Sequence, residues 1–508
     1  MKREYDVIII GGGITGAGTA RDCALRGLSV LLIERHDLAD GATGRNHGLL
    51  HSGARYAVKD GESARECIAE NRILRRIAPN CIEDTQGLFI TLPEDADSGY
   101  GLDYQQSFIN ACRNAGIDAR RLDPAEAIEM EPSVNPRLIG AVQVPDGSVD
   151  PFKLCAANTL DARLHGADVL TWTAVDGLII EGGRVCGVKV SRRDGSSEEY
   201  RARVVVNAAG IWGQTIAAMA GASITMFPAK GALLVFAHRI NNVVINRCRK
   251  SADGDILVPG DTVSVIGTTS TKVPLDECDS LRVTPEEVEL LLREGSSLCP
   301  SLASTRILRA YAGVRPLVAS DDDPTGRSIS RGIICLDHAT RDGIEGFVTI
   351  TGGKLMTYRL MAQIATDTVC AKLGVSAPCT TASVPLPDTI ERRFEPDSED
   401  SELVCECENI TLGQIRSAVR NFDIHSMDDL RRRTRVGMGT CQGTYCIRRA
   451  ARALAEAKGE PASAKELAAQ YLDERWKGMM PVGWGDTLRE MEFMQKVFKG
   501  GAPSTFKE

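Results

Sequence analysis

The chain has 508 residues, a formal net charge of −8 and a hydrophobic content of 43%. This length is sufficient for two or three domains with large buried cores, and the composition is ordinary for a soluble globular enzyme. The acidic balance disfavours nucleic acid as the main partner, because binding to a phosphate backbone requires a concentrated basic surface. A small anionic substrate needs only a few local cations, so that class of ligand stays open.

The sequence contains no run of 18 or more consecutive apolar residues, which disfavours a transmembrane helix. The short apolar run at residues 7–10 leads directly into glycines and is expected to be a buried strand instead of a signal peptide. In so large a chain without an export signal, the 16 cysteines are expected to be reduced thiols of a cytoplasmic protein. Most of them stand singly and are interpreted as small buried hydrophobes. Four are grouped near the C-terminus.

The N-terminal segment carries the pattern G-x-G-x-x-G between an expected strand and an expected helix. Gly11 permits the tight turn, Gly13 lets the backbone approach a pyrophosphate, and Gly16 lets helix and strand pack closely. The helix expected over about 14–26 points its unsatisfied N–H groups and its positive dipole at the phosphates. The order of strand, turn, helix and second strand predicts a dinucleotide-binding domain.

Glu34 ends the second expected strand, eighteen residues after Gly16. A carboxylate at this place accepts hydrogen bonds from a ribose 2′-OH and disfavours a 2′-phosphate, so NADP is not expected. The pattern alone leaves FAD and NAD open. Two segments favour FAD: residues 40–48 offer small residues and backbone donors for the pyrophosphate and ribityl chain, and the strand end at 207–212 allows a second loop to close over the nucleotide.

Four segments together resemble the FAD-dependent glycerol-3-phosphate dehydrogenases of the D-amino-acid-oxidase-like superfamily: the glycine turn, residues 48–56, residues 207–212 and GGKLMTYR at 352–359. The resemblance covers residues 1 to about 385. It implies an α/β fold (α+β overall), with a Rossmann-like FAD-binding domain and an inserted antiparallel-sheet substrate domain. The residues expected to bind FAD are Gly11, Gly13, Ile14, Thr15, Gly16, Glu34, Arg35, Thr43, Gly44, His47, Gly48, Val175, Ala209, Gly210, Trp212, Gly353, Lys354, Leu355 and Met356.

The same resemblance implies a substrate site lined by cations on one face of the flavin. Residues 51–56 (HSGARY) and 311–317 (YAGVRPL) match the two arginine loops of the family, and Lys354 lies in the loop that closes over the flavin. Planar bidentate arginines and a lysine point charge suit a phosphate dianion. The expected phosphate and oxyanion ligands are Arg55, Arg315 and Lys354, and Tyr56 is expected to orient the substrate.

Oxidation of a secondary alcohol requires hydride transfer from C2 to flavin N5 and an acceptor for the hydroxyl proton. His51 is the first candidate for this base, because an unperturbed imidazole titrates near neutral pH, and His47 is the second. Alternatively, Arg315 or Lys354 stabilises a developing alkoxide while water takes the proton. A structural role for either histidine also stays open.

The four grouped cysteines, Cys405, Cys407, Cys441 and Cys446, form the pattern C-x-C-x33-C-x4-C. Four thiolates at paired spacing predict either a zinc site or a [2Fe–2S] cluster. The C-x-C spacing is tighter than in most structural zinc sites, which favours the cluster over zinc and over unliganded thiols. The pattern resembles the [2Fe–2S]-binding domain related to bacterioferritin-associated ferredoxin.

An arginine run, LRRRTR at residues 430–435, precedes the second cysteine pair. Such a run usually forms a solvated face. Near an anionic four-thiolate cluster, however, Arg433 and Arg435 would stabilise the reduced form and raise its potential. Both interpretations stay open from the sequence.

Composition divides the chain into four expected parts. Residues 1–385 form the oxidoreductase, 386–402 a proline-rich and acidic linker, 403–458 a small helical [2Fe–2S]-binding domain, and 459–508 a helical tail broken near Pro481. The apolar side chains of the tail cover either a partner or the chain's own domains; they are Trp476, Met479, Met480, Trp484, Met491, Phe493, Met494 and Phe498.

With its cysteine module the whole chain resembles the catalytic A subunits of bacterial anaerobic glycerol-3-phosphate dehydrogenases. That resemblance implies oxidation of sn-glycerol 3-phosphate to dihydroxyacetone phosphate, a second dehydrogenase subunit, an iron–sulfur membrane-anchor subunit, and electron delivery to quinone. It also implies a peripheral position on the inner face of the cell membrane. Two other functions stay open: a related flavin dehydrogenase of a hydroxy or amino acid, which needs only one cationic clamp, and a non-catalytic iron–sulfur electron-transfer partner.

Overall fold

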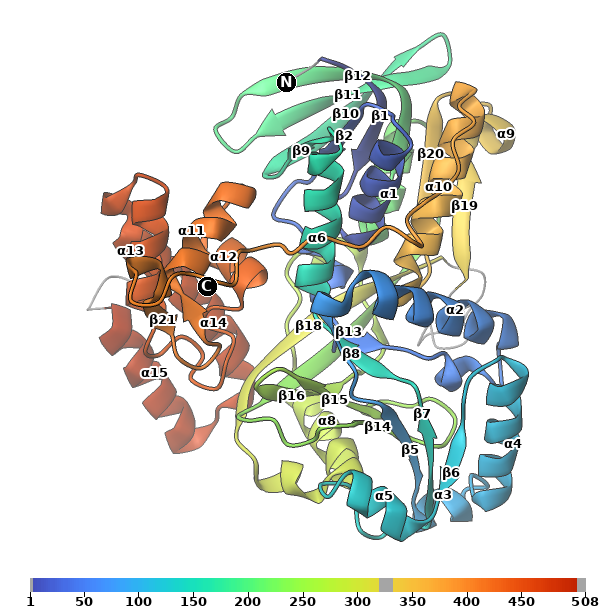
Figure 1. Ribbon diagram of the computed structural model, residues 1–508, viewed down its shortest axis with the longest axis vertical. Coiled ribbons are helices and arrows are strands. Elements are labelled where there is room, and N and C mark those ends of the chain that lie inside the picture. Colours follow the sequence, from blue (N-terminus) through green and yellow to red (C-terminus); the bar gives the residue numbers. More distant parts are fainter. Residues whose placement is uncertain (1–2, 319–331, 500–508) are drawn as a thin grey trace.

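The computed structural model describes residues 3–318 and 332–499. Three parts are visible in Figure 1: a sheet flanked by helices at the top, a second sheet with peripheral helices below it, and a helical module at the left. They are called here the dinucleotide domain, the sheet domain and the helical module. The chain passes between the first two domains several times before it enters the third.

The dinucleotide domain is built on a mixed sheet of eight strands, in the order β10-β11-β12-β1-β2-β9, with β20 beside β12 and β19 beside β20. Its central pairs are parallel, while β10, β11 and β19 are antiparallel to their neighbours. The strands are β1 Glu4–Ile10, β2 Val30–Ile33, β9 Asp168–Leu170, β10 Thr173–Glu181, β11 Arg184–Arg192, β12 Ser197–Asn207, β19 Ile333–Asp337 and β20 Phe347–Gly352.

Three helices pack side by side against this sheet (Figure 1): α1 Ile14–Leu25, α6 Pro151–Leu164 and α10 Tyr358–Leu373. Strand β1 is apolar over 7–10 and buried there on both faces, which is the pattern of a central parallel strand. Helix α1 is made largely of small residues and is buried around most of its circumference, so it lies closely between sheet and neighbouring helices. The strand, turn, helix and strand predicted for residues 5–34 are confirmed.

The sheet domain contains nine strands in the order β17-β13-β16-β15-β14-β5-β7-β6, with β18 beside β13. All pairs are antiparallel except β14 with β5. The strands are β5 Gly87–Thr91, β6 Arg120–Leu122, β7 Gly140–Val144, β13 Met226–Phe236, β14 Val244–Arg247, β15 Ile256–Gly260, β16 Val263–Gly267, β17 Thr271–Lys272 and β18 Ile307–Val318. The mixed α/β architecture with a largely antiparallel second sheet agrees with the fold expected from the sequence.

Short elements complete these two domains. A three-stranded sheet, β3 Leu49–Leu50, β8 Gly147–Val149 and β4 Ile82–Glu83, lies where the chain crosses between them. The remaining helices are α2 Gly61–Ile77, α3 Pro93–Asp97, α4 Leu102–Asn114, α5 Pro124–Met130, α7 Gly213–Met219, α8 Pro285–Leu298 and α9 His338–Asp342.

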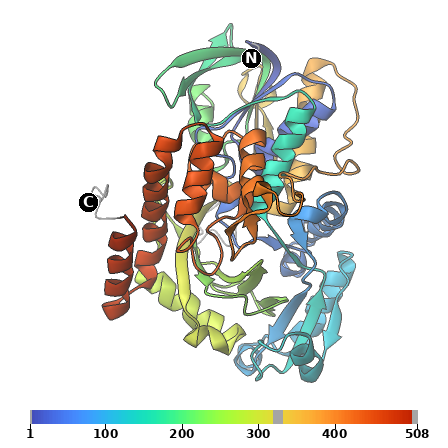
Figure 2. The same ribbon diagram turned by 60° about the vertical axis from the view of Figure 1, so that its left-hand side comes forward.

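The helical module consists of the two-stranded β21 Leu403–Cys405 and β22 Ile410–Thr411 and the helices α11 Leu412–Asn421, α12 Met427–Thr434 and α13 Ile447–Ala457. It is followed by α14 Ala464–Met479 and α15 Gly485–Lys499, which lie beside it in Figure 2. The expected break in the tail is present between these two helices, where a short 3₁₀ turn, Met480–Val482, intervenes.

The segment before the module, expected as a linker, is irregular apart from one 3₁₀ turn at Glu399–Ser401. Its Leu386 and Ile390 side chains are nevertheless buried in the same apolar core as the dinucleotide domain. The part of the segment around Leu386 and Ile390 is therefore packed against the dinucleotide domain. In the described residues no helix is long and apolar enough to cross a membrane.

Candidate active site and cysteine cluster

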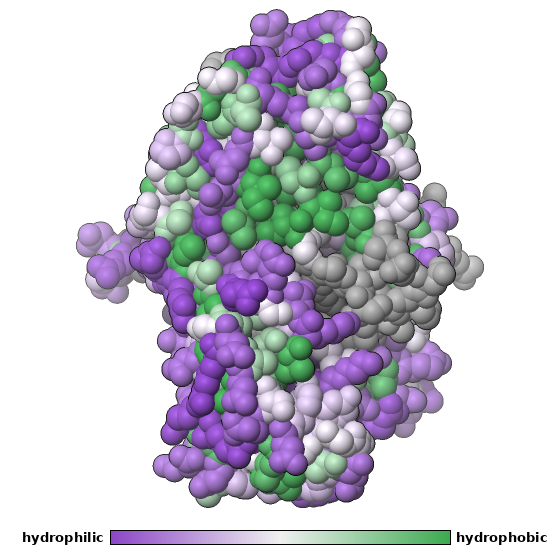
Figure 3. All heavy atoms as spheres, turned by 90° about the vertical axis from the view of Figure 1, so that its right-hand side faces the viewer, coloured by the Kyte–Doolittle hydropathy of each residue, from purple (hydrophilic) through white to green (hydrophobic). Residues whose placement is uncertain are grey.

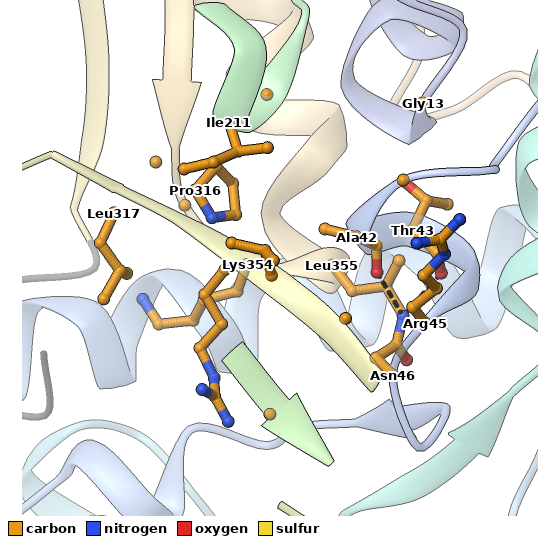
Figure 4. Close-up of a pocket in the computed structure, with 18 of the residues that line it drawn as sticks. Gly13, Ala42, Thr43, Arg45, Asn46, Ile211, Pro316, Leu317, Lys354 and Leu355 are labelled. Atoms are coloured by element: carbon orange, nitrogen blue, oxygen red, sulfur yellow. Dashed lines mark hydrogen bonds between the residues drawn. The ribbon is translucent and has the colours of Figure 1, made fainter. Parts of the chain in front are cut away.

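A cavity of about 1380 Å³ lies between the dinucleotide domain and the sheet domain. Figure 4 shows a close-up of it, with Gly13, Thr43 and Asn46 at one end and Lys354 and Leu317 toward the other. Figure 3 shows apolar side chains gathered on one face of the molecule, just below its hydrophilic upper end. Residues of the glycine turn and residues of both arginine loops line this one cavity.

The glycine turn leaves no room for side chains. Gly11 has φ +113°, and a Cβ atom there would lie 2.6 Å from the carbonyl oxygen of Ala208. A Cβ on Gly16 would lie 1.9 Å from the carbonyl oxygen of Gly11, so only glycine lets α1 start so close to β1. Gly13 lines the cavity at the start of α1, and as a glycine it offers no side chain of its own to cap that helix end. These features fit a pyrophosphate placed against the helix N-terminus.

Glu34 lies at the carboxyl end of β2 and lines the cavity. Its two carboxylate oxygens accept hydrogen bonds from the backbone N–H groups of Gly12 (2.7 Å) and His36 (2.9 Å). Burial raises the pKa of this carboxyl, while the two backbone hydrogen bonds lower it. The guanidinium of Arg35 lies 4.2 Å from the ring centroid of Trp212, so these two residues form one wall beside Glu34.

The loop after β2 lies across the glycine turn. Thr43 Oγ1 accepts a hydrogen bond from the backbone N–H of Ile14 (3.0 Å), and the Asn46 side-chain amide donates to the carbonyl oxygens of Thr43 (2.6 Å) and Ala42 (3.2 Å). Gly44 and Gly48 do not line this cavity. A Cβ on Gly44 would lie 2.3 Å from a backbone oxygen of the same loop, and Gly48 has φ +72°. Both therefore shape the loop that lies against the cavity, and their contact with FAD stays a prediction.

Arg55 belongs to a short turn before α2 and reaches the cavity from the sheet-domain side. It forms an ion pair with Asp255 (3.2 Å), whose side chain is fully buried and also binds Arg249 (2.7 Å). Because the carboxylate is held by the backbone N–H of Ala252 as well (2.6 Å), its position is fixed. Asp255 thus orients Arg55 toward the cavity.

Arg315 projects from β18, a long strand paired with β13. Its guanidinium donates to Thr268 Oγ1, to the carbonyl oxygen of Thr269 (2.9 Å) and, more weakly, to the carbonyl oxygen of Ala229 (3.4 Å). A Cβ on Gly231 would lie 2.7 Å from an Arg315 nitrogen, so the bare backbone of β13 makes room for the side chain. The arginine is therefore held by backbone and hydroxyl oxygens of neighbouring segments of the sheet domain.

Lys354, Tyr56 and His51 lie together at the same end of the cavity. The Lys354 ammonium lies 4.8 Å from the Tyr56 ring centroid, and the His51 and Tyr56 rings are 5.6 Å apart. The backbone N–H of Lys354 donates to Thr357 Oγ1 (2.9 Å), which fixes the turn at the start of α10. His51 is 9% exposed.

The structure thus brings to one cavity the proposed catalytic and substrate residues and sixteen of the nineteen proposed FAD residues, all but Gly16, Gly44 and Gly48. It brings His47 to this cavity too, so both candidate bases remain near the site. Residues that the sequence did not indicate are Arg249, Asp255, Thr268 and Thr269. They lie in strands and hairpins without a recognisable motif, and only pairing of distant strands places them here.

The four motif cysteines lie together in the helical module. Cys446 forms side-chain hydrogen bonds with Cys405 and with Cys441, and Cys441 also contacts Cys407. The bond from Cys446 lowers the pKa of Cys441 to about 5 and that of Cys405 to about 6. A donor set of four clustered thiols, two favoured as thiolates, fits an iron–sulfur cluster.

Two glycines lie close to the cysteine cluster and to the neighbouring Tyr471 ring. A Cβ on Gly439 would lie 2.6 Å from the Cys407 Cβ, and a Cβ on Gly443 would lie 2.7 Å from the Tyr471 ring. Within the described residues, no group of three or more His, Cys, Asp or Glu side chains is arranged to hold a single metal ion.

The arginine run before the second cysteine pair is not a solvated face, because Arg433 is 1% exposed and the Arg435 side chain is 14% exposed. Arg433 pairs with the buried Asp37 of the dinucleotide domain. Arg435 pairs with Glu408 (2.8 Å) and Asp261 (2.9 Å). Since carboxylates neutralise both guanidiniums, the structure gives no support to their proposed effect on a cluster potential.

Residues 6–359 match the family described as FAD dependent oxidoreductase, and residues 403–456 match the BFD-like [2Fe-2S] binding domain. The chain is therefore an FAD-dependent oxidoreductase that carries a [2Fe–2S]-binding domain, and its cofactors are FAD and a [2Fe–2S] cluster. The second match favours the cluster over the zinc alternative.

Curated relatives narrow this class. The A subunit of anaerobic glycerol-3-phosphate dehydrogenase from Escherichia coli (strain K12) is 59% identical, over 98% of this chain and 97% of the relative. The protein of the same name from Haemophilus influenzae is 56% identical, over 97% of this chain and 92% of the relative. The chain belongs to the family of anaerobic glycerol-3-phosphate dehydrogenase A subunits.

Solved structures share the fold at lower sequence identity. The glycerol-3-phosphate dehydrogenase from Bacillus halodurans complexed with FAD has a TM-score of 0.58 and 21% identity, and the match covers 99% of this chain and 97% of that one. Glycine oxidase from Geobacillus kaustophilus has a TM-score of 0.59 and 21% identity, over 76% of this chain and 99% of that one. These similarities agree with the mixed α/β fold described above.

Proposed function

We propose that this chain oxidises sn-glycerol 3-phosphate to dihydroxyacetone phosphate and delivers the electrons through its [2Fe–2S] cluster to partner subunits. The observation that carries the proposal is the meeting of Arg55, Arg315 and Lys354 in the cavity that also contains the glycine turn. A single carboxylate is held by one cationic clamp, whereas three cations suit the two negative charges of a phosphate. The identity to relatives named as this dehydrogenase supports the same substrate.

The nucleotide is held by the turn and the loop around it. The N–H groups at the start of α1 face the pyrophosphate, Glu34 accepts from a ribose hydroxyl, and Arg35 with Trp212 flanks the end of the cavity near that carboxylate. The remaining proposed FAD residues line the cavity between this end and Lys354, apart from the glycines Gly16, Gly44 and Gly48, which shape the turn and loop.

The reaction removes a hydride from the alcohol carbon and a proton from its hydroxyl group, in total two electrons and two protons. When bound, FAD accepts the hydride. Arg55, Arg315 and Lys354 bind the phosphate, Tyr56 orients the C2 hydroxyl, and His51 accepts the hydroxyl proton in the first assignment. In the second assignment Lys354 or Arg315 stabilises the alkoxide and water takes the proton.

The electrons leave by way of the cysteine module. Cys405, Cys407, Cys441 and Cys446 would hold a [2Fe–2S] cluster, which would supply a one-electron acceptor for the reduced flavin and would be reoxidised by a partner between the two electrons. In the proposal they are received by a second dehydrogenase subunit, then by an iron–sulfur membrane-anchor subunit, with quinone as the final oxidant. The relatives are named as A subunits, which supports the presence of other subunits. Binding to the inner face of the cell membrane would then take place through those partners.

Anaerobic mixing tests the substrate. The holoenzyme is mixed with sn-glycerol 3-phosphate, glycerol or a 2-hydroxy acid while flavin absorbance is followed. We expect bleaching by the phosphate ester and none by glycerol, because glycerol lacks the dianion. Bleaching by the hydroxy acid in place of sn-glycerol 3-phosphate would contradict the proposal and favour a related dehydrogenase.

An arginine variant tests the site itself. Arg315→Lys keeps the charge but loses the planar fork, so kcat/KM for sn-glycerol 3-phosphate is expected to fall about tenfold or more. Arg137→Lys is the matched control, since the Arg137 side chain is 68% exposed and does not line the substrate cavity. If Arg315→Lys and Arg137→Lys had equal kcat/KM values, Arg315 would not belong to the substrate site.

A further inference from the structure

The helical module is attached to the loop that follows the nucleotide-binding acid Glu34. Asp37 and Asp40 lie three and six residues after Glu34, in the loop that continues to Thr43. Arg432 of α12 binds Asp37 (3.0 Å) and Asp40 (2.5 Å) with its two terminal nitrogens. Arginine can bridge two carboxylates in this way because its donors are fixed in one plane.

Arg433, the next residue of α12, binds the other carboxylate oxygen of Asp37. Asp37 is 0% exposed and Arg433 is 1% exposed, so this pair is fully removed from water. The Arg433 guanidinium also lies 5.2 Å from the ring centroid of Phe422 in the same module. We call the four charged residues Asp37, Asp40, Arg432 and Arg433 the clasp.

The clasp is costly to build, which argues that it is more than incidental packing. Transfer of paired charges out of water is repaid only by good geometry, and removal of one partner is strongly destabilising because it leaves a buried charge uncompensated. Helix α12 suits this role, because Ser426 and Asp429 form a capping box at its start and its arginines lie in the last turn, where the helix dipole favours cations.

The region around the clasp is hollow. A second cavity of about 1030 Å³ lies between the three parts of the molecule. Its walls include Asp37 and Asp40 from the dinucleotide domain, Arg432 and Arg435 from α12 and its end, and Gln442, which follows the cluster cysteine Cys441. The module and the dinucleotide domain also share an apolar core, and around this cavity the ion pairs of the clasp add a directional link to it.

The clasp loop also faces the first cavity. Glu34, Asp40, Thr43 and Arg45 line the proposed FAD site, and the same loop lines the second cavity on its other side. One short segment therefore contacts both the nucleotide site and the module that carries the four cysteines.

We propose that the clasp is a positioning device for electron transfer: it fixes the cluster at a set distance from the flavin, so that the reduced flavin passes single electrons to the cluster rapidly. Each transfer oxidises the flavin by one electron and reduces one ferric ion of the cluster. The inference rests on the proposed function for its electron donor. Electron transfer becomes steeply slower with separation, whereas hydride transfer from substrate to flavin does not depend on the module.

Arg432→Gln tests the device in the holoenzyme loaded with both cofactors. Stopped-flow absorbance with sn-glycerol 3-phosphate reports flavin bleaching, and freeze-quench electron paramagnetic resonance reports the reduced cluster. We expect flavin bleaching at the wild-type rate and cluster reduction slowed about tenfold or more, as for other misplacements of reacting groups. Arg452→Gln is the matched control, because Arg452 is in α13, is 77% exposed and pairs with Glu456 of the same helix. Both of its rates should equal those of the wild type.

A double-mutant cycle assigns the effect to the pair. If Arg432 acts through Asp40, then Asp40→Asn and Arg432→Gln slow cluster reduction non-additively when combined. Cluster reduction at the wild-type rate in Arg432→Gln would overturn the proposal. Should that variant fail to retain iron, Arg432→Lys, which keeps the charge but not the bridge, decides in the same way: slower reduction supports the clasp and an unchanged rate overturns it.

Failure of the proposed function is distinguishable from failure of the clasp. If sn-glycerol 3-phosphate did not bleach the wild-type flavin, the proposed substrate would be wrong. The clasp could then still be tested by photoreduction of the flavin, which needs no substrate. Under photoreduction the same comparison of Arg432→Gln with Arg452→Gln applies, and equal cluster-reduction rates would again overturn the proposal.

Discussion

At the scale of single residues, the site depends on positions where a side chain cannot fit or where one partner orients another. Gly16 allows the close approach between α1 and the turn before it. The need for glycine there follows from the motif and could be predicted from the sequence. The ion pair of Arg55 with Asp255 could not, because the two residues are 200 positions apart and no motif surrounds Asp255.

Gly16→Ala should prevent stable FAD binding. The new Cβ would lie 1.9 Å from the carbonyl oxygen of Gly11, so the turn must move, and overpacking of this kind costs about 1–3 kcal/mol. The measurement is flavin content after purification together with the melting temperature. Gly177→Ala is the control, since a Cβ at Gly177 meets no atom within 4 Å. Full flavin occupancy in Gly16→Ala would contradict this explanation of the turn.

At the scale of elements, helix α12 connects two parts of the chain that are far apart in sequence. Its capping box is local and its boundaries follow from ordinary helix signals: Ser426 precedes the helix and Asp429 is its third residue. The ion-pair partners of its arginines are distant in sequence: Arg432 and Asp37 are 395 positions apart. The charge run therefore gave no indication of whether it was solvated, beside the cluster or bound to another domain.

Ser426→Ala is expected to destabilise the helical module by about 1 kcal/mol, because the Ser426 hydroxyl accepts the hydrogen bond of the Asp429 N–H at the helix start. Chemical denaturation followed by the absorbance of the cluster measures the change. Ser463→Ala serves as the comparison, since Ser463 precedes α14 without a side-chain capping bond. If the two variants were equally stable, the capping box would not contribute to the module.

The clasp is expected to be insensitive to pH above the neutral range. Burial raises the pKa of Asp40, but the hydrogen bond with His36 and the charges of Arg432 and Arg45 outweigh it and hold the pKa well below its usual value. A depressed carboxyl pKa contributes stability above the unfolded value, about 3.9, and loses it only as pH falls through the lower folded value. Asp429 of α12 also faces Arg432 (4.0 Å), and burial raises its pKa to about 6, so it loses its proton within the range from about pH 5 to pH 7. Hydrogen exchange of α12 amides between about pH 7.5 and pH 9, where both carboxyls are ionised, should therefore show constant protection after correction for intrinsic rates. Opening with a midpoint between these limits would contradict the ion-pair explanation.

At the scale of the whole molecule, the proposed function joins two units that the sequence separates clearly, the flavin site and the cysteine module, in one path from substrate to partner. The dinucleotide turn and the cysteine pattern are compact in sequence, so their presence, their order and the family resemblance could be predicted. The assembly of the substrate site could not be predicted, because it depends on the pairing of distant strands. Strand β18 lies beside β13, and this pairing, together with the chain crossings between the domains, brings Arg315 to Arg55 and Lys354.

The apolar side chains of the C-terminal tail are divided between the interior and the surface. Met479 and Met491 are buried and Trp484 and Phe493 are exposed, while the Phe498 side chain lies outside the described residues.

The most direct test of the central claim is an anaerobic titration of the holoenzyme with sn-glycerol 3-phosphate, without any partner subunit, followed by flavin absorbance and by the paramagnetic signal of the cluster. We expect the flavin to bleach and a reduced-cluster signal then to appear, with the four motif cysteines as the only iron ligands required. A bleached flavin with a cluster that stays oxidised, although dithionite reduces it, would contradict the proposed electron path.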